Sequence, residues 1–320
     1  MQAQGSHQKI FRKGDAIYSR GMKKTVVGLG EVLWDVFPDR ACLGGAPANF
    51  AYITTLLGDH GIVASRVGDD ERGIEALHRM EELRLDTTHV QPDQEHPTGT
   101  VKVELNAEAQ PRFEIAHPVA WDFLEWTEDW RHLAEEADAV CFGSLAQRSE
   151  QSRETIRCFL AATSSSAVKV FDINLRQAYY SQEIIDESMK GADLVKLNDE
   201  ELPRVMSLFG FPHTDEQSSA ERLAGVYGLQ LVCVTRGARG SLLVRGEQAS
   251  EHRGFNVKVA DTVGSGDAFT AGLVHEYLLG ASLKRMNEVA NRVGAWVASE
   301  VGGMPVPKHG IEHELAEVGK

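Results

Sequence analysis

The chain has 320 residues, of which 42% are hydrophobic and 25% are charged, as in an ordinary globular protein. Its net charge of −14 argues against nucleic-acid binding, because nucleic-acid binders usually present a basic face. No run approaches the roughly 18 apolar residues that cross a bilayer. The four cysteines are scattered without a CxxC pair, and the chain lacks an apolar signal-like start. We therefore expect a cytoplasmic enzyme that contacts neither nucleic acid nor membrane.

The predicted elements begin after residues 1–22, which have no hydrophobic period and are expected to be a disordered tail. Residues 24–30 are predicted to form a strand, and residues 47–58 a helix with Pro47 in its first turn. A second strand is predicted at 61–68 and an amphipathic helix at 71–83. Further strands, with helical patterns between them, are predicted at residues 138–143, 168–174, 193–198 and 229–237.

This alternation of strands and helices predicts an α/β fold, with a mainly parallel sheet covered by helices on both faces. Residues 98–115 break the pattern, because polar and apolar residues alternate there with no helix between them. They are predicted to form an antiparallel hairpin that belongs to a small projecting sheet. We expect residues 23–320 to form one domain that carries this small β-lid.

Three motifs argue against other activities. The segment GLGEVL at 28–33 has Leu33 where a dinucleotide fingerprint needs its third glycine, so a nicotinamide cofactor is not expected. The Walker pattern GxxxxGK[ST] is absent. The segment HGIEH at 309–313 has a zinc-protease spacing but follows two prolines late in the sequence, and we do not expect zinc catalysis there.

The segment DTVGSGDAF, residues 261–269, carries the strongest chemical signal. Its glycines let a ligand approach the main chain, and helical spacing of apolar residues follows. The free N–H groups of a helix start suit an anion such as phosphate. Asp267 lies beside them, where it could accept a proton from an attacking hydroxyl. The alternative is an ordinary helix start with an acidic first turn.

Two earlier segments could bind a polar ligand. GGAPAN at 44–49 places Gly44, Gly45 and Asn49 around a helix start, and the Asn49 amide can both donate and accept hydrogen bonds. Asp35 follows the first strand, where open parallel sheets place ligand-binding groups. The alternatives are a plain strand-to-helix turn and a solvated loop acid.

Two later segments are also ambiguous. NDEE at 198–201 can form a capping box between Asn198 and Glu201, or hold hydrated magnesium through its oxygens. TRGARG at 235–240 can lie along a nucleotide phosphate or ribose, or form a hairpin turn into the next strand.

Taken together, these motifs resemble the ribokinase-like carbohydrate kinase family (the PfkB family). GGAPAN and DTVGSGDAF resemble its two signatures, NDEE its NxxE motif and TRGARG its TxGxxG motif, with GExxxD before them. The order and spacing match from about residue 23 to residue 307. The resemblance implies an ATP-dependent sugar kinase with a doubly wound sheet. It also implies lid strands at about 34–46 and 98–118.

The resemblance also implies roles for individual residues. Asp267 would be the catalytic base, with an anion hole formed by Gly264, Ser265 and Gly266. The sugar hydroxyls would be held by Asp35, Gly44, Gly45 and Asn49, together with Asp267. The nucleotide would contact Asn198, Glu201, Thr235, Gly237, Gly240, Gly264, Gly266 and Asn291. Glu201 would bind Mg²⁺ through water, and Asp261 and Thr262 would bind a monovalent cation such as K⁺.

GEVLWDVFP, GGAPANFA and DINLR look most like the fructokinase branch, which makes fructose the expected substrate. Arg176 of DINLR would then be a cation near the sugar or the transferred phosphate. Ser265 departs from the usual alanine, and Pro47 replaces the lysine of ribokinases, which counts against ribose. Alternatives are a kinase for 2-keto-3-deoxygluconate, ribose or a nucleoside, or a non-catalytic sugar or nucleotide sensor. Lid edges of this type suggest a homodimer.

Overall fold

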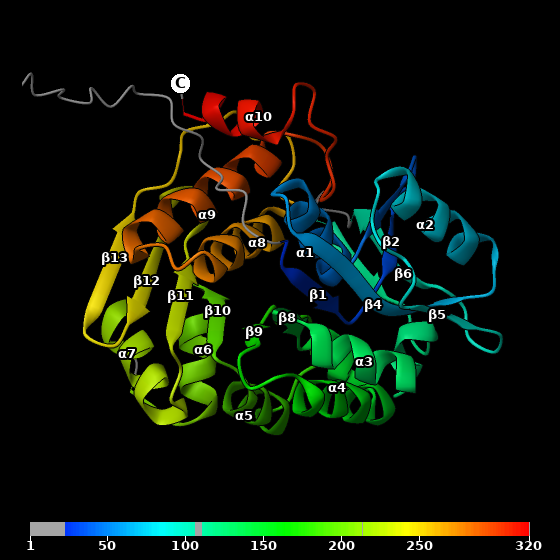
Figure 1. Ribbon diagram of the computed structural model, residues 1–320, viewed down its shortest axis with the longest axis horizontal. Coiled ribbons are helices and arrows are strands. Elements are labelled where there is room, and N and C mark those ends of the chain that lie inside the picture. Colours follow the sequence, from blue (N-terminus) through cyan, green and yellow to red (C-terminus); the bar gives the residue numbers. More distant parts are fainter. Residues whose placement is uncertain (1–22, 106–110, 213, 320) are drawn as a thin grey trace, which may run out of the picture.

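The computed structural model describes residues 23–105, 111–212 and 214–319, and the tail expected at 1–22 lies outside these ranges (Figure 1). A nine-stranded sheet runs through the centre, in the order β13-β12-β11-β10-β9-β8-β1-β4-β5. All neighbouring strands are parallel except at one edge, where β12 is antiparallel to both β11 and β13. The strands are β1 Thr25–Leu29, β4 His60–Gly68, β5 Val90–Asp93, β8 Ala139–Gly143, β9 Val168–Asp172, β10 Leu194–Asn198, β11 Leu231–Thr235, β12 Ser241–Arg245 and β13 Gln248–His252.

Helices cover both faces of this sheet, as the strand–helix alternation predicts (Figure 1). One face carries α1 Ala46–Leu56, α2 Glu71–Glu82, α8 Ser265–Leu278, α9 Leu283–Ala298 and α10 Ile311–Glu317. The other face carries α3 Glu128–Glu136, α4 Glu150–Ala162, α5 Gln182–Gly191, α6 Glu201–Leu208 and α7 Glu216–Tyr227. Three short 3₁₀ helices join these elements: η1 Ala120–Phe123, η2 Leu145–Arg148 and η3 Gly237–Arg239. The doubly wound α/β fold is therefore confirmed.

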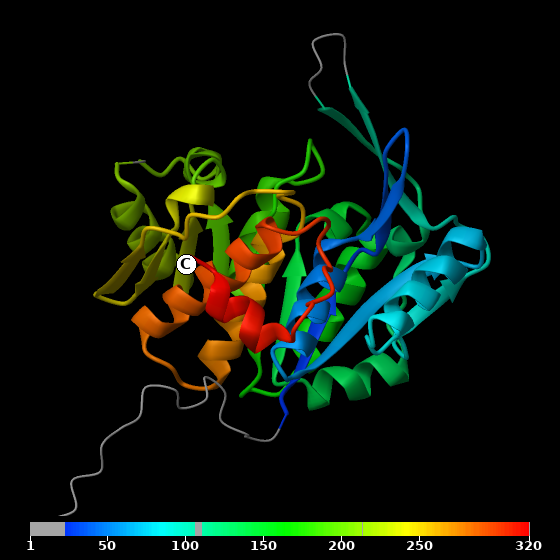
Figure 2. The same cartoon turned by 90° about the horizontal axis from the view of Figure 1, so that it is seen from above.

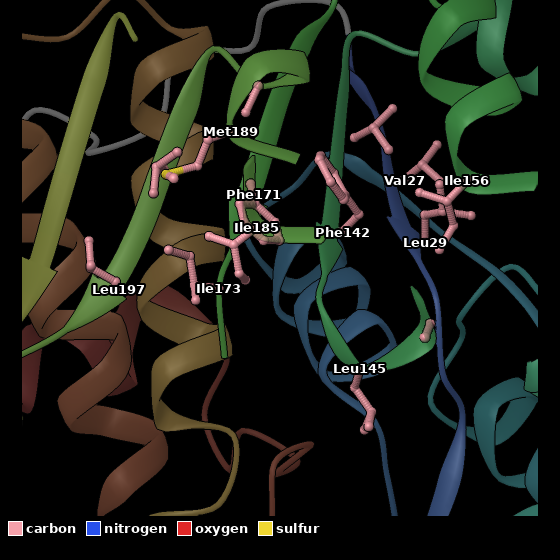
Figure 3. Close-up of a cluster of buried hydrophobic side chains, with 14 of the residues drawn as sticks. Val27, Leu29, Phe142, Leu145, Ile156, Phe171, Ile173, Ile185, Met189 and Leu197 are labelled. Atoms are coloured by element: carbon pink, nitrogen blue, oxygen red, sulfur yellow. The ribbon is translucent and has the colours of Figure 1, made fainter. Parts of the chain in front are cut away.

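Each face of the sheet has its own hydrophobic core, because successive side chains of a strand point to opposite faces. In β1, Val27 and Leu29 pack against the α3–α7 face, and Val26 packs against the other. Figure 3 shows the first of these cores, where Phe142 and Phe171 of neighbouring strands stack with their ring centroids 5.2 Å apart. The two cores hold the sheet rigidly between its helices, so the strand ends are fixed relative to α1 and α8.

A second, four-stranded sheet projects from this body, in the order β3-β2-β6-β7 (Figure 2). Its strands are β2 Leu33–Val36, β3 Ala41–Gly44, β6 Gly99–Leu105 and β7 Pro111–Ile115. β6 and β7 pair antiparallel, which confirms the hairpin predicted at residues 98–115. β2 is antiparallel to β3 and parallel to β6, so two segments far apart in sequence share this sheet.

No helix within the described ranges combines the length and the apolar character that crossing a membrane requires.

Candidate active site

The polar residues of the central strands gather at one edge of the sheet. Asp172, Asn198 and Thr235 are the last residues of β9, β10 and β11, which run parallel. Open α/β sheets bind ligands in the crevice outside the carboxyl ends of their strands. The structure therefore brings three separate sequence motifs to one place, and the site is built around them.

The start of α8 lies beside these strand ends. Gly264 precedes the helix in a left-handed conformation, with φ 73°. It packs so tightly on a neighbouring loop that a Cβ would lie 2.3 Å from the Cα atom of Gly303. The first intrahelical bond runs from Ala268 N to Gly264 O, at 2.8 Å. The amides of Gly266 and Asp267 therefore come before the bonded part of the helix, where they suit an anion.

Ser265 contributes less to this amide cluster than the sequence suggests. Its amide donates to Thr262 O at 3.3 Å, and its hydroxyl donates to the same oxygen at 3.0 Å. The hydroxyl is thereby turned toward its own loop. Of the three residues expected to form an anion hole, Ser265 has its amide already engaged within the protein.

Asp267 is paired with Asn49 across 218 residues of sequence. The Asn49 Nδ2 group donates to Asp267 Oδ2 at 2.8 Å. Asn49 lies in the first turn of α1 and is buried, and its Oδ1 has no hydrogen-bond partner among the described residues. Gly303 packs on the same side chain, since a Cβ there would be 2.5 Å from Asn49 Oδ1. A glycine at 303 thus keeps Asn49 aligned with Asp267.

Burial, and after it the nearby Asp172 carboxylate, raise the pKa of Asp267 to about 6. The hydrogen bond from Asn49 and the charges of Lys196 and Arg176 act in the opposite direction. A pKa near 6 leaves the carboxylate ionised at neutral pH, yet more basic than an ordinary aspartate. Such a group can take up a proton from a reacting hydroxyl.

A buried ion pair lies directly under this helix start, and sequence reasoning missed it. Lys196 Nζ donates to both carboxylate oxygens of Asp172, at 3.0 and 3.1 Å. Thr270, one turn into α8, donates to Asp172 Oδ2 at 2.9 Å. The only signal in the sequence is a lysine inside the apolar strand VKLN, where a buried charge needs a partner.

A second pair of carboxylates lies on β2 of the small sheet and just before it. Asp35 lies on β2, and a Cβ on Gly44 of β3 would be 2.8 Å from Asp35 Oδ2. Burial raises the pKa of Asp35 to about 6 and that of the neighbouring Glu31 to about 7. These values hold despite the nearby Arg176 charge, which acts to lower both. Glu31 was not predicted from the sequence as a site residue, although it is the second residue of the GExxxD pattern.

The turn between β3 and α1 requires a glycine. Gly45 has φ 110° and directly precedes α1, and a Cβ there would be 2.4 Å from Glu31 O. The turn therefore packs the start of α1 against Glu31 and Val32, just before β2. A cavity below the turn is lined by Ala46, Pro47, Phe50, Cys141, Phe142, Gly143, Asp172, Asn174, Asp267 and Thr270. Arg176 lies on the exposed loop after β9, at the rim of the site.

The NDEE segment forms the capping box that the sequence allows. Asn198 Oδ1 accepts from Glu201 N, and Glu201 Oε2 accepts from Asn198 N, both at 2.8 Å. Glu201 Oε1 accepts from Leu175 N at 2.8 Å, so this buried carboxylate also fixes the loop that carries Arg176. Each carboxylate oxygen of Glu201 keeps a second lone pair that can accept another hydrogen bond.

The remaining predicted residues lie around β11, β12 and α9. Thr235 ends β11, and Gly237 and Gly240 form the turn into the antiparallel β12 that the sequence allows. Gly240 has φ 86°, and a Cβ there would be 1.9 Å from His252 O. Asn291 is buried in α9, and its Nδ2 donates to Ser241 Oγ at 2.7 Å. The Asn291 amide therefore joins α9 to β12.

Asp261 and Thr262 lie in the loop that leads to α8. The Asp261 carboxylate accepts from Val263 N at 3.1 Å and from Gly302 N at 3.2 Å. It thereby ties this loop to the loop that carries Gly303. In the described part of the chain, no three His, Cys, Asp or Glu side chains converge as a metal site would require.

The fold and the site define a class of phosphoryl-transfer enzyme, and comparison with known proteins gives the family. Residues 39–309 match the model of the pfkB family carbohydrate kinases. The chain belongs to this family and is a carbohydrate kinase.

Individual relatives are similar along most of their length. The chain is 31% identical to a fructokinase of Escherichia coli over 307 residues, which cover 88% of this chain and 96% of the relative. The structure resembles a Pyrococcus horikoshii sugar kinase in complex with ATP, with a TM-score of 0.78, 27% identity and coverage of 91% and 99%. It also resembles a Vibrio cholerae fructokinase with bound fructose, ADP and calcium ion, with a TM-score of 0.75, 27% identity and coverage of 88% and 95%.

Proposed function

We propose that this carbohydrate kinase transfers the γ-phosphoryl group of ATP to D-fructose and forms fructose 6-phosphate. The proposal depends on the contact of Asn49 with Asp267 beside the first-turn amides of α8. Fructokinases among its relatives and a Vibrio cholerae fructokinase with bound fructose support the choice of sugar. Pro47, where ribokinases have lysine, weighs against ribose.

The reaction needs alignment of a hydroxyl with the γ-phosphorus, a proton acceptor and exclusion of water. In our proposal the hydroxyl oxygen attacks phosphorus as its proton passes to a carboxylate oxygen of Asp267. The bond from phosphorus to the bridging oxygen breaks, and ADP leaves with that electron pair. Asn49 orients the Asp267 carboxylate, and the amides of Gly264 and Gly266 lie next to the transferring oxygens.

The sugar is held from the side of the small sheet. Asp35 would accept hydrogen bonds from two hydroxyls, Gly44 would leave room for the sugar beside it, and Gly45 would bring the backbone close to the sugar. Arg176 would contact the sugar or the phosphoryl group, because its charge already acts on both Asp35 and Asp267. The small sheet would close over the sugar as a lid and keep water away.

The nucleotide would lie along Thr235, Gly237, Gly240 and Asn291, with its phosphates directed toward α8. Mg²⁺ bound to the phosphates would neutralise their charge, and Glu201 and Asn198 would hold it through water, as the free lone pairs of Glu201 allow. Asp261 and Thr262 would place backbone oxygens around a monovalent cation. A related fructokinase structure with potassium ion bound supports this proposal.

Two further expectations accompany the activity. β3 and β7 form the edges of the small sheet, and pairing of such edges would give a homodimer. The cysteines Cys42, Cys141, Cys158 and Cys233 are free thiols, which supports a reducing, cytoplasmic compartment.

The substrate is tested by ADP release from the purified protein with MgATP. The assay is run across fructose, ribose, 2-keto-3-deoxygluconate and nucleosides. We expect the highest kcat/KM with fructose, and a product phosphorylated at the 6-hydroxyl by NMR. A higher kcat/KM for another acceptor would replace fructose with that compound. Sugar-dependent stabilisation without ADP release from any acceptor would indicate a sensor.

A further inference from the structure

Lys196 lies against the first turn of α8. Its side chain extends from β10 and is only 8% exposed. A Cβ built on Gly266 would be 3.2 Å from Lys196 Nζ, so the ammonium group lies against the first turn of α8. This is the turn whose amides precede the bonded part of the helix.

Among the residues that the structure describes, Asp172 is the hydrogen-bond partner of the Lys196 ammonium group. Two of its three N–H bonds point to the oxygens of Asp172, at 3.0 and 3.1 Å. Thr270 fixes Asp172 by donating to Oδ2 at 2.9 Å. The third N–H bond of Lys196 has no acceptor within residues 23–105, 111–212 and 214–319 and is available to another group. A buried lysine whose position is fixed loses little freedom when it binds an anion.

The excess of negative charge around the site also favours a cation at the position of Lys196. Carboxylates of Glu31, Asp35, Asp172 and Asp267 surround the site, and phosphoryl transfer brings more negative charge to it. Arg176 is exposed on a loop, whereas Lys196 is buried in the rigid sheet. A fixed cation in a water-poor site stabilises developing charge more strongly than a mobile, solvated one.

We propose that Lys196 is a catalytic residue whose ammonium group contacts the phosphoryl group in transit, while Asp172 and Thr270 are positioning residues that hold it. This inference rests on the proposed kinase mechanism but is independent of the identity of the sugar. The alternative is that Lys196 and Asp172 form an ion pair with a structural role only.

The test compares Lys196→Met with a matched control, Lys190→Met, which removes an exposed lysine paired with Asp186 on α5. The wild-type protein is first assayed with the acceptor panel. Its turnover tests the proposed function separately from this inference. We expect Lys196→Met to lower kcat about 10²–10³-fold, as loss of one transition-state contact does. The KM values for sugar and ATP should change little, and Lys190→Met should match the wild type.

A second readout does not depend on turnover. ADP with magnesium, aluminium fluoride and the sugar mimics the phosphoryl group in transit, and its binding is measured by calorimetry. Lys196→Met should weaken this complex by about the same 10²–10³-fold factor and leave binding of ADP alone unchanged. Equal binding of the mimic by variant and wild type would overturn the proposal.

A lone Asp172 could prevent Lys196→Met from folding, because removal of one partner leaves an uncompensated buried charge. The double variant Lys196→Met with Asp172→Asn removes both charges and is tested in the same way. Folded protein with low kcat and weak binding of the mimic supports the catalytic role. Folded protein with wild-type kcat shows that the pair is structural and refutes the proposal.

The positioning role of Asp172 can be tested separately through the pH profile of kcat. Burial lowers the pKa of Lys196, but the carboxylates of Asp172, Glu201 and Asp267 raise it, and the net direction is upward. Removal of Asp172 should let the buried lysine lose its proton at lower pH. We therefore expect Asp172→Asn to add an alkaline decline to the pH profile of kcat. A profile that keeps the wild-type shape would show that Asp172 does not act through Lys196.

Discussion

The substitution Asp267→Asn separates the catalytic and the structural consequences of one carboxylate. Asparagine keeps the size of the side chain and an oxygen that can accept from Asn49, but it cannot take a proton from the sugar. A general base contributes about 10²–10⁴-fold to the rate. We therefore expect kcat to fall by that factor, while the Kd for sugar changes little.

The same substitution should stabilise the fold. Burial and Asp172 raise the pKa of Asp267 from 3.8 to about 6, so ionisation of this group opposes folding at neutral pH. A shift of about two pH units corresponds to ~3 kcal/mol. Asp267 is partly exposed, and solvent screening reduces the expected gain to about 1–3 kcal/mol.

The stability gain of Asp267→Asn depends on pH, because the carboxylate opposes folding only when it is ionised. The carboxylate is protonated in both states below the unfolded pKa of 3.8, and its penalty is complete above the folded pKa of about 6. The stability gain of Asp267→Asn should therefore be full at about pH 8 and mostly lost at about pH 4.5.

Urea unfolding at these two pH values measures the gain, with Asp39→Asn as the control, because Asp39 is exposed in the turn between β2 and β3. Near-normal kcat in Asp267→Asn would remove Asp267 from the role of base. A loss of stability at about pH 8 would refute the electrostatic reasoning.

Three further predictions follow from the site. The kcat/KM should fall as the pH drops below about 6, because Asp267 and Asp35 have pKa values of about 6 and act when ionised; a flat profile down to about pH 5 would contradict both roles. Arg176→Ala should lower kcat about tenfold or more if the guanidinium meets developing charge, and unchanged steady-state kinetics would reduce it to a surface residue. Gly303→Ala would place a Cβ 2.5 Å from Asn49 Oδ1 and should lower kcat by misaligning Asp267, with the fold checked by circular dichroism; wild-type kcat in that variant would show that the loop yields easily.

Much of the fold could be predicted from local patterns. The strands and the helix starts carry strong signals in hydrophobic period and in Gly and Pro placement, as at Pro47 and Gly264. The hairpin at 98–115 was also predictable, because polar and apolar residues that alternate over two adjacent segments are typical of paired strands. β5, at Val90–Asp93, was missed because it is short and contains a proline.

The site was harder to predict, because its contacts join distant parts of the chain. The Asn49–Asp267 bond spans 218 residues, and no local pattern can predict it without the family resemblance. Lys196 and Asp172 lie on different strands, and each looked like part of a buried apolar run. Gly303 matters only because the loop that carries it packs on Gly264 and Asn49.

The most direct test of the account is a crystal structure with the sugar and a non-hydrolysable ATP analogue. We predict that the acceptor hydroxyl lies about 2.6–3.2 Å from a carboxylate oxygen of Asp267. We also predict that the γ-phosphate oxygens lie at the amide of Gly266. A sugar bound with its hydroxyls away from Asp267, or a γ-phosphate away from the start of α8, would contradict the proposed mechanism.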